Sequence, residues 1–384
     1  MKVLFNCTTN TKGGGVKNSA MFIKYAILDK ENFFYFAISQ EVKDILVKWD
    51  IDTSCMFLFD KSPARSKNKR DALYKLANKL DVDLVFTMAG PAYVNFEQTH
   101  LMGISNPYIT HTDFQGLSIG KTLKEVIKTV MLTTYQAYYA LKADFWMFQT
   151  IASRNGFIKR YFKNREKTFV VNNAIGNEFK EFFVDNQIKY INLDKTINIF
   201  CPAADYYHKA LHLIPKIVKE LVVLSKNSYH FKFTLTIDNN SAIWKEISKK
   251  CQLYSVVEQV KNIGPYNYAN VLNLFKNSDI VFVPSVLETF SASYLEAYAS
   301  KKPLVVSDKK FVKDICKDAA LYIDPFDSKK VAETLDMLIR DKDIQKKLIS
   351  EGERRLNDYG NQEKRYEDIV KIFNKIRGAN NVQK

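Results

Sequence analysis

Short apolar runs alternate with longer amphipathic segments along almost the whole chain. Short apolar runs bounded by turn residues are typical of buried parallel strands, whereas apolar positions that recur every three or four residues are typical of helices. In the first half, this pattern predicts strands at 3–7, 33–38, 84–87, 108–110, 144–148 and 168–172. Helices are predicted between them at 16–28, 41–48, 67–79, 121–141 and 151–162.

The second half repeats the same alternation. Its predicted strands are 197–201, 232–237, 256–263, 280–283, 304–307 and 321–323. Its predicted helices are 209–225, 242–250, 268–275, 291–299, 328–340 and 343–356. Because strands that alternate with helices build parallel sheets, we predict an α/β protein with two doubly wound, Rossmann-like domains. Ligands of such sheets bind beyond the carboxyl ends of the strands.

The domain boundary is predicted from length and composition. A chain of 384 residues favours two domains. The stretch 173–194 is polar and irregular, with Gly176 and several asparagines, and is the predicted join. We therefore expect a first domain at 1–175, a second domain at 176–360, and a C-terminal segment at 361–384 with a helix at 364–376.

Composition excludes several classes of protein. Hydrophobic residues make up 46% of the chain, which is enough for sizeable cores and too much for disorder. No apolar run is long enough to span a bilayer, and residues 1–6 resemble a buried strand rather than a signal peptide. The five cysteines are scattered without a C-x-x-C pair, so neither a disulfide framework nor a zinc site is predicted. These features predict a cytoplasmic protein.

The segment around Glu288 carries the most specific chemistry. An apolar strand that ends at Val283 runs into Pro284, then Glu288, a turn of small residues, and a predicted helix that carries Glu296. The N-terminus of a helix offers unpaired N–H groups and a dipole that favour a phosphate. Eight residues of helix rise about 12 Å, so helical spacing places the two carboxylates about that far apart along the axis. That arrangement suits a nucleotide-sugar, although acidic residues eight apart also occur by chance on a solvated helix face.

The same segment resembles a known enzyme family. Residues 288–308, which read ETFSASYLEAYASKKPLVVSD, are similar to the E-x7-E block of the retaining, family-4 type glycosyltransferases. The resemblance is strongest over residues 196–340. It implies the GT-B fold, with two Rossmann-like domains facing a central cleft and a last helix that crosses back onto the first domain. It implies a metal-independent transferase that moves a hexosyl unit from a nucleotide-diphosphate sugar to a hydroxyl of a glycan or lipid-linked glycan.

The resemblance also implies roles for residues of the second domain. Glu288 would bind the hydroxyls of the donor sugar, and Glu296 the hydroxyls of the ribose. Lys209, at the start of a predicted helix, would neutralise the departing diphosphate, whereas Ala204 stands where the family has an arginine. The other expected donor-binding residues are the backbone groups of Phe290, Ser291 and Ala292 and the turn formed by Ile263, Gly264 and Tyr266.

In the first domain, the resemblance implies that His111 contacts the donor sugar and that Gly13, Gly14 and Gly15 lie across the cleft from the phosphates. Without the family, His111 is a structural histidine that lacks companions for a metal site, and the glycines form a flexible turn. The acidic pair at Asp81 and Asp83 precedes a strand, at the end opposite the expected ligand site. We therefore predict no metal and no cofactor beyond the nucleotide-sugar co-substrate.

The formal net charge is +15, and most of the excess lies in residues 1–175 and in the last 24 residues. Basic stretches at 61–70 and 157–165, with the helix that begins at Lys121, suit an anionic membrane surface, nucleic acid or a solvated face. No DNA- or RNA-binding motif is present, so we expect no nucleic-acid partner. A solvated face is the first interpretation of these stretches, and peripheral binding at the inner face of the membrane is the second, because many resembling enzymes use membrane-anchored acceptors. The open alternatives are a GT-B-type nucleotide-sugar 2-epimerase or phosphorylase and a basic nucleic-acid-binding protein.

Overall fold

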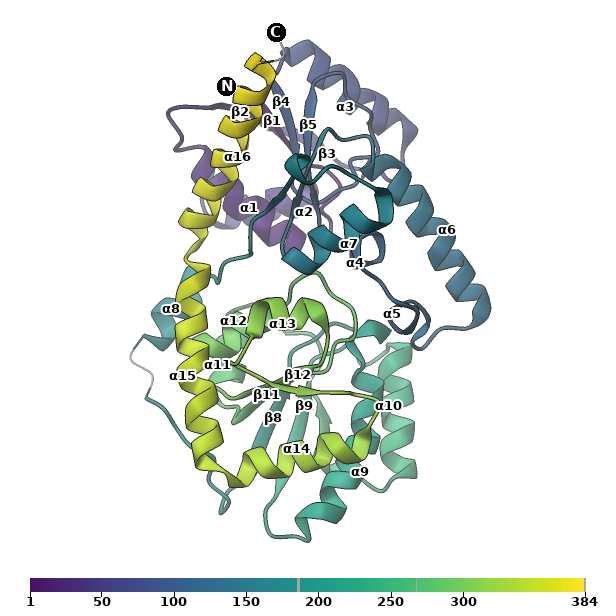
Figure 1. Ribbon diagram of the computed structural model, residues 1–384, viewed down its shortest axis with the longest axis vertical. Helices are drawn as coiled ribbons and strands as arrows, with labels where there is room; N and C mark the ends of the chain where they lie inside the picture. The colour runs from purple at the N-terminus through teal and green to yellow at the C-terminus, as the bar shows by residue number, and fades with distance from the viewer. Residues whose placement is uncertain (185–186, 267, 383–384) are drawn as a thin grey trace. The chain divides into compact units, whose positions relative to one another are not determined.

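The computed structural model describes residues 1–184, 187–266 and 268–382. These residues divide into two compact units (Figure 1). The N-terminal unit comprises Met1–Thr112, Lys124–Asn172 and the segment from Gln362, and the C-terminal unit comprises Asp113–Leu123 and Asn173–Asn361. Residues 185 and 186 of the predicted join and residues 383 and 384 of the predicted C-terminal segment lie outside the described residues.

The N-terminal unit is built on a seven-stranded parallel sheet with the order β3-β2-β1-β4-β5-β6-β7. Its strands are β1 (Lys2–Cys7), β2 (Phe33–Ser39), β3 (Phe57–Phe59), β4 (Leu84–Thr87), β5 (Thr99–Ile104), β6 (Phe145–Phe148) and β7 (Thr168–Val170). Its helices are α1 (Gly14–Ala26), α2 (Gln40–Lys48), α3 (Lys67–Leu80), α4 (Pro107–Thr110), α6 (Leu123–Ala140), α7 (Ile151–Tyr161) and α16 (Gln362–Val382). The strand order reverses between β1 and β4, as in doubly wound folds.

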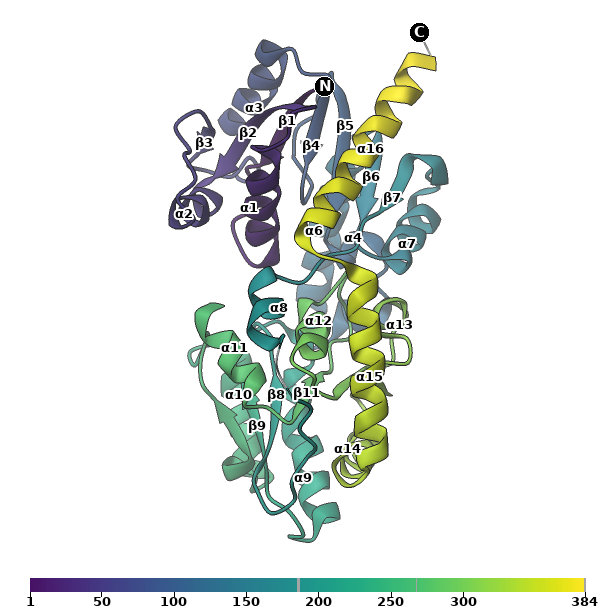
Figure 2. The ribbon, with the colours of Figure 1, turned by 90° about the vertical axis from the view of Figure 1, so that its left-hand side faces the viewer.

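The helix α16 belongs to the N-terminal unit although it is last in the sequence (Figure 2). Ile369, Ile372 and Phe373 lie in the same buried cluster as the strands β1 and β4. The ring of Phe373 packs 5.4 Å from that of Phe86, centroid to centroid. Because these apolar side chains have no other core to fill, their burial fixes the end of the chain to this unit.

The C-terminal unit contains a six-stranded parallel sheet with the order β10-β9-β8-β11-β12-β13. Its strands are β8 (Ile197–Cys201), β9 (Phe231–Leu235), β10 (Val260–Asn262), β11 (Ile280–Val283), β12 (Leu304–Ser307) and β13 (Leu321–Ile323). Its helices are α5 (Phe114–Ser118), α8 (Asn177–Phe183), α9 (Ile214–Ser225), α10 (Ala242–Leu253), α11 (Tyr268–Lys276), α12 (Ala292–Ala299), α13 (Lys310–Cys316), α14 (Ser328–Arg340) and α15 (Lys342–Tyr359).

Several predicted elements are wrong in type or position. Residues 108–110 form a turn of α4 rather than a strand, because Asn106 caps the helix and Pro107 occupies its first position. The strand of this region is β5, whose sequence THLMGI lacks a long apolar run. The strand β3 and the helices α5, α8 and α13 were not predicted, and α8 lies within the stretch 173–194 that was expected to be irregular. Each is short, and its position depends on tertiary packing.

Candidate functional site

The most specific sequence motif lies at the switch point of the C-terminal sheet, which is the place where its strand order reverses. The strands β8 and β11 are neighbours, although other elements separate them in the sequence, and the strand order reverses between them. The loop after β8 leads to Lys209, and the loop after β11 carries Glu288. Because the carboxyl ends of adjacent parallel strands lie at one edge of the sheet, both loops meet where doubly wound folds bind ligands.

Lys209 and Glu288 form a buried ion pair at this edge. The ammonium Nζ of Lys209 lies 2.7 Å from Oε1 of Glu288, and their side chains are only 16% and 8% exposed. The backbone N–H of Val286 donates to the carbonyl of His208 over 2.8 Å, which holds the two loops together. Lys209 therefore reaches Glu288 from the end of a 3₁₀ turn, Tyr207–Lys209, and not from the start of α9, which begins at Ile214.

The charges of this pair control the ionisation of their neighbours. Burial raises the pKa of the Glu288 carboxyl, but Lys209, together with the smaller effects of Ser285 and His208, more than offsets this increase, so the pKa lies below its ordinary value. Burial and the Lys209 ammonium lower the pKa of His208 to about 4, against the smaller opposing effect of Glu288. At neutral pH, Glu288 is therefore ionised and His208 is neutral. His208 was not predicted as a site residue, because a single histidine in a loop carries no sequence signal.

The helix α12 begins at Ala292, shortly after Glu288 in the sequence. Ser291 is its N-cap, and the Ser291 side chain makes no capping hydrogen bond within the described structure. The first turn contains no acidic residue, so the N–H groups at Phe290, Ser291 and Ala292 form an electropositive end suited to an anion. The helix covers only 292–299, so the expected separation of the two glutamates by eight helical residues is wrong.

Glu296 and Tyr266 lie within electrostatic range of each other. Burial and the Glu296 carboxylate raise the pKa of the Tyr266 hydroxyl. Ile263 follows β10, and its N–H donates to the carbonyl of Leu235 over 3.0 Å. Gly264 is buried and has a positive φ of 76°, as the predicted turn requires. These predicted residues thus share the C-terminal unit with Glu288, while their assigned roles stay predictions.

A segment from the middle of the first half also belongs to the C-terminal unit. Ile119 packs in one apolar cluster with Ala210 and Val286, which flank the ion pair in the sequence. The next residue, Gly120, has no room for a side chain, because an added Cβ would lie 2.0 Å from the Tyr207 ring. The adjacent Lys121 is close enough to lower the pKa of His208 further. The sequence pattern had assigned these residues to the first domain and to a helix from 121, so Lys121 was not predicted as a residue of this site.

The predicted residues of the first half lie in the N-terminal unit. Gly13 is the N-cap of α1, with a positive φ of 64°, and Gly14 and Gly15 open the helix. His111 ends α4, and its Nδ1 lies 2.8 Å from Oγ1 of Thr110 and 3.4 Å from Oγ of Ser153. These neighbours give His111 a fixed orientation in the N-terminal unit. The donor-side roles implied for His111 and the glycines remain predictions.

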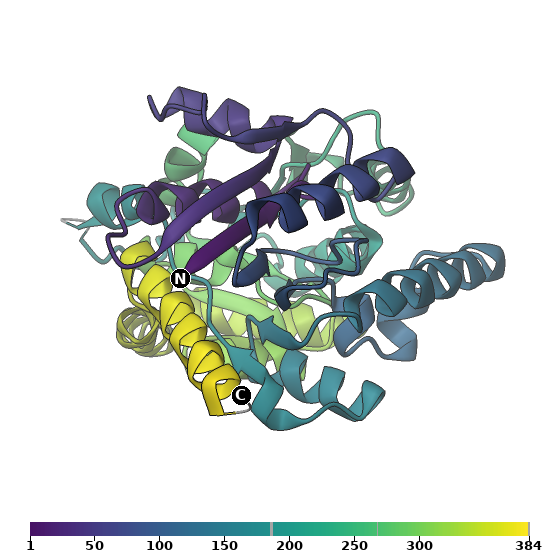
Figure 3. The same cartoon turned by 90° about the horizontal axis from the view of Figure 1, so that it is seen from above.

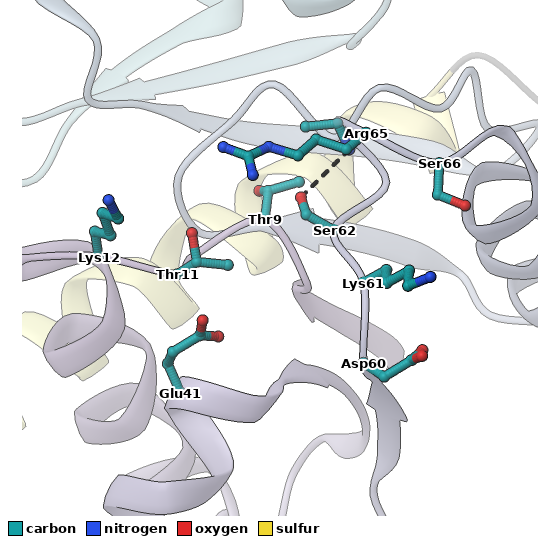
Figure 4. Close-up of a pocket in the computed structure, with 10 residues that line it drawn as sticks. Thr9, Thr11, Lys12, Glu41, Asp60, Lys61, Ser62, Arg65 and Ser66 are labelled. Carbon is teal, nitrogen blue, oxygen red and sulfur yellow. Dashed lines mark hydrogen bonds between the residues drawn. The ribbon is translucent and has the colours of Figure 1, made fainter.

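The N-terminal sheet has a polar cavity at its carboxyl edge (Figure 4). Its volume is about 600 Å³, and its lining comes from the loops after β1 and β3 and from the first turn of α2. The lining residues are Thr9, Thr11, Lys12, Glu41, Asp60, Lys61, Ser62, Ala64, Arg65 and Ser66. Asp60 pairs with Lys69, which lies outside the lining, so Lys12, Lys61 and Arg65 outweigh Glu41 in charge. The cavity thus offers hydroxyls and cations to a polar ligand.

Within 1–184, 187–266 and 268–382, no group of three His, Cys, Asp or Glu side chains is arranged to hold a metal ion. Asp83 accepts a hydrogen bond from the N–H of Lys2 over 2.8 Å, at the start of β1. It therefore lies at the amino end of the sheet, as a strand-entry turn would. No helix in the described part of the chain is long and apolar enough to cross a membrane.

Comparison with protein families finds a match in the second half of the chain. Residues 185–355 match the family model Glycosyl transferases group 1. A comparison with curated protein sequences finds no match. The matched range covers the two loops that carry Lys209 and Glu288, together with α12.

Comparison with solved structures identifies the fold. The chain is similar to a glycosyltransferase from Rickettsia africae, with a TM-score of 0.72 and 15% identity over 98% of each chain. It is similar to HepE from Anabaena in complex with UDP and glucose, with a TM-score of 0.73 and 14% identity over 97% of this chain and 99% of that chain. A trehalose-6-phosphate protein from Escherichia coli bound with UDP-2-fluoro glucose gives 0.66 and 12%, over 97% and 98%. These similarities confirm the predicted α/β, GT-B fold.

Proposed function

We propose that this protein, whose residues 185–355 match the family model Glycosyl transferases group 1, is a retaining, metal-independent hexosyltransferase. Its donor is a nucleotide-diphosphate sugar, and its acceptor is a hydroxyl of a glycan or lipid-linked glycan. The buried Lys209–Glu288 pair at the switch point of the C-terminal sheet is the observation that carries this proposal. The UDP and UDP-sugar complexes of the structurally similar HepE support a uridine nucleotide as the first donor to test.

The two side chains of the Lys209–Glu288 pair have different roles in the proposed reaction. The Glu288 carboxylate accepts hydrogen bonds from hydroxyls of the donor sugar, because it is ionised and almost buried. The Lys209 ammonium, now held by Glu288, attracts the diphosphate as negative charge develops on it. The N–H groups at the start of α12 bind the phosphate next to the sugar, and Glu296 binds the ribose.

Lys121 is the second cation that we assign to the diphosphate. Ala204 is an exposed residue after β8 and contributes no charge. Lys121 lies close enough to His208, the neighbour of Lys209, to shift its pKa. Its segment is fixed against the site by the packing of Ile119 and Gly120. Two ammonium groups supply the positive charge that other sugar transferases obtain from a metal ion.

In the proposed reaction, the acceptor oxygen forms a bond to the anomeric carbon of the donor sugar. The bond between that carbon and the diphosphate oxygen breaks on the same face, so the configuration is retained. The acceptor proton passes to a phosphate oxygen, and the nucleoside diphosphate leaves with its charge balanced by Lys209 and Lys121. No protein side chain forms a covalent bond with the sugar.

The acceptor side of the proposal rests on the N-terminal unit. The hydroxyls of Thr9, Thr11 and Ser62 and the cations Lys61 and Arg65 line a cavity at the carboxyl edge of its sheet. Convergent hydroxyls and charges of this kind bind sugar hydroxyls through directional hydrogen bonds. The excess of positive charge, +15 for the whole chain, suits acceptors that stand on an anionic membrane surface.

The first experiment is a thermal-shift screen of nucleotides and nucleotide-sugars, in EDTA and again with Mg²⁺. We expect one nucleotide-sugar to raise the melting temperature equally in both buffers. The stabilising donor is then incubated with and without glycan acceptors. Conversion of the donor to an epimer without any acceptor would identify an epimerase, and polyanion binding without any nucleotide-sugar shift would refute the transferase.

Variants connect the activity to the site. Glu288→Gln should abolish transfer while the donor-free protein remains folded, and Lys209→Met should lower turnover roughly a hundredfold. Asp336→Asn is the matched control, because Asp336 also pairs with a cation, Arg340, but on the helix α14. Normal turnover of Glu288→Gln would contradict the proposed site.

A further inference from the structure

The helix α6 is attached to the N-terminal unit by one face. Ala137 and Ala140 are buried in this unit. The side chain of Asn106 donates to Oε1 of Gln136 over 2.8 Å, and the indole N–H of Trp146 donates to the carbonyl of Ala140 over 2.8 Å. These contacts orient the helix around its axis, and the helix projects at the edge of the N-terminal unit (Figure 3).

An exposed face about a third of a turn away from these alanines is apolar. Ile127, Val130, Met131 and Tyr138 are 53%, 44%, 68% and 56% exposed. We call these four residues the α6 stripe. At about 100° per residue they lie within roughly one third of the helix circumference, so they form one continuous surface. Isolated exposed apolar residues are normal on proteins, whereas a row of large ones along one helix marks a binding surface.

Lysines border the α6 stripe. Lys124 and Lys128 lie about a quarter turn from its centre, whereas Glu125 lies on nearly the opposite side. Beyond the helix, the Lys142 ammonium lies 4.9 Å from the centroid of the Tyr138 ring. The stripe therefore presents apolar side chains with amines beside them. An amphipathic helix that lies in a lipid headgroup layer has this pattern, with its apolar side chains inserted and its lysines near the lipid phosphates.

We propose that the α6 stripe docks the protein on an anionic lipid bilayer, with α6 parallel to the membrane plane. Charge complementarity favours this occupant over a second copy of the chain, because pairing two α6 stripes would bring their bordering lysines together. The proposal rests on the proposed function only in its purpose, which is to bring the site to lipid-linked acceptors.

The test is co-sedimentation of the full chain with phosphatidylcholine vesicles, with and without phosphatidylglycerol. We expect binding to the anionic vesicles that falls as salt is added. Ile127→Ser with Met131→Ser should weaken this binding roughly tenfold or more. Lys124→Gln with Lys128→Gln should weaken it about fivefold for each lysine and should reduce its salt dependence. Val223→Ser with Leu253→Ser is the control, because both residues are exposed apolar residues of the C-terminal unit.

Three results would overturn the proposal. The first is no vesicle binding by the wild type, and the second is equal vesicle binding by the wild type and the Ile127→Ser, Met131→Ser variant. The third is a wild-type dimer in sedimentation velocity that the same double substitution converts to a monomer, which would assign the stripe to a second copy. Vesicle binding needs no turnover, so each of these failures leaves the donor-dependent thermal shift, and with it the proposed function, unaffected.

Discussion

The ion pair between Lys209 and Glu288 allows a double-mutant cycle in which the sign of each change in unfolding free energy can be predicted. Replacing either partner leaves the other charge in a site where the side chains are 16% and 8% exposed. Removing one member of a buried pair costs several kcal/mol, so we expect Glu288→Gln and Lys209→Met each to lower the unfolding free energy by about 3 kcal/mol. The double variant leaves no unpaired charge, so its loss should fall short of the sum by about 2 kcal/mol.

The two single variants should differ in their pH dependence. In Lys209→Met, burial, the largest influence on Glu288, is opposed only by the smaller effects of Ser285 and His208, so we expect the pKa of its carboxyl to rise above the ordinary value in the folded state. Between the ordinary pKa and this raised pKa, the folded state holds a proton that the unfolded state has lost. The destabilisation of Lys209→Met therefore grows as pH rises from the ordinary pKa to the raised one. Glu288→Gln removes the titrating group, so its destabilisation should stay constant between pH 5 and pH 8.

The assay must report on the C-terminal unit alone, because a chain with two units need not unfold in one step. Of the three tryptophans, only Trp244 lies in that unit, where it packs against the core. The cycle is therefore measured by tryptophan fluorescence during urea unfolding, in a background with Trp49→Phe and Trp146→Phe. Additive losses below about 1 kcal/mol, with equal pH dependence, would show that the two side chains are not coupled.

Three further predictions follow from single contacts. Burial lowers the pKa of His100 to about 3, so below about pH 6.5 the unfolded state binds a proton that the folded state does not. The N-terminal unit should therefore lose about 3 kcal/mol of unfolding free energy between pH 7 and pH 4.5. In urea titrations, His100→Gln should make the unfolding free energy nearly independent of pH over this range. Gly120→Ala should lower the unfolding free energy by about 3 kcal/mol, because the added Cβ would clash with the Tyr207 ring. Gly13 has the same φ of 64° but open space around it, so Gly13→Ala should cost only about 1 kcal/mol. Equal losses of stability for the two variants in thermal melts would contradict the clash. Glu296→Gln should raise the KM for the donor without changing kcat, and an unchanged KM in steady-state kinetics would remove Glu296 from the nucleotide site.

The sequence determined the fold class because strand and helix signals are local. Apolar runs such as 280–283 and 304–307 are strands in the structure, and the amphipathic segment 328–340 is the helix α14. The motif after β11 was also readable, because its glutamates lie within one strand–turn–helix unit. The alternation of strands and helices allows few connections, since parallel strands need crossovers of one hand.

The tertiary structure decided what depends on contacts between distant segments. Lys209 meets Glu288 only because β8 and β11 are neighbours in the sheet, and no local pattern encodes that adjacency. Lys121 comes near them because Ile119 buries against the same loops, although the chain before Asp113 and after Leu123 belongs to the other unit.

The helix α6 shows the same division between sequence and structure. Its sequence is apolar on several sides, which predicts a helix but not the face that remains exposed. The contacts of Ala137 and Ala140 fix the buried face and leave Ile127 and Met131 in solvent. Local propensities thus determined the elements, while burial and pairing determined which side chains meet, because these energies exist only once the elements pack.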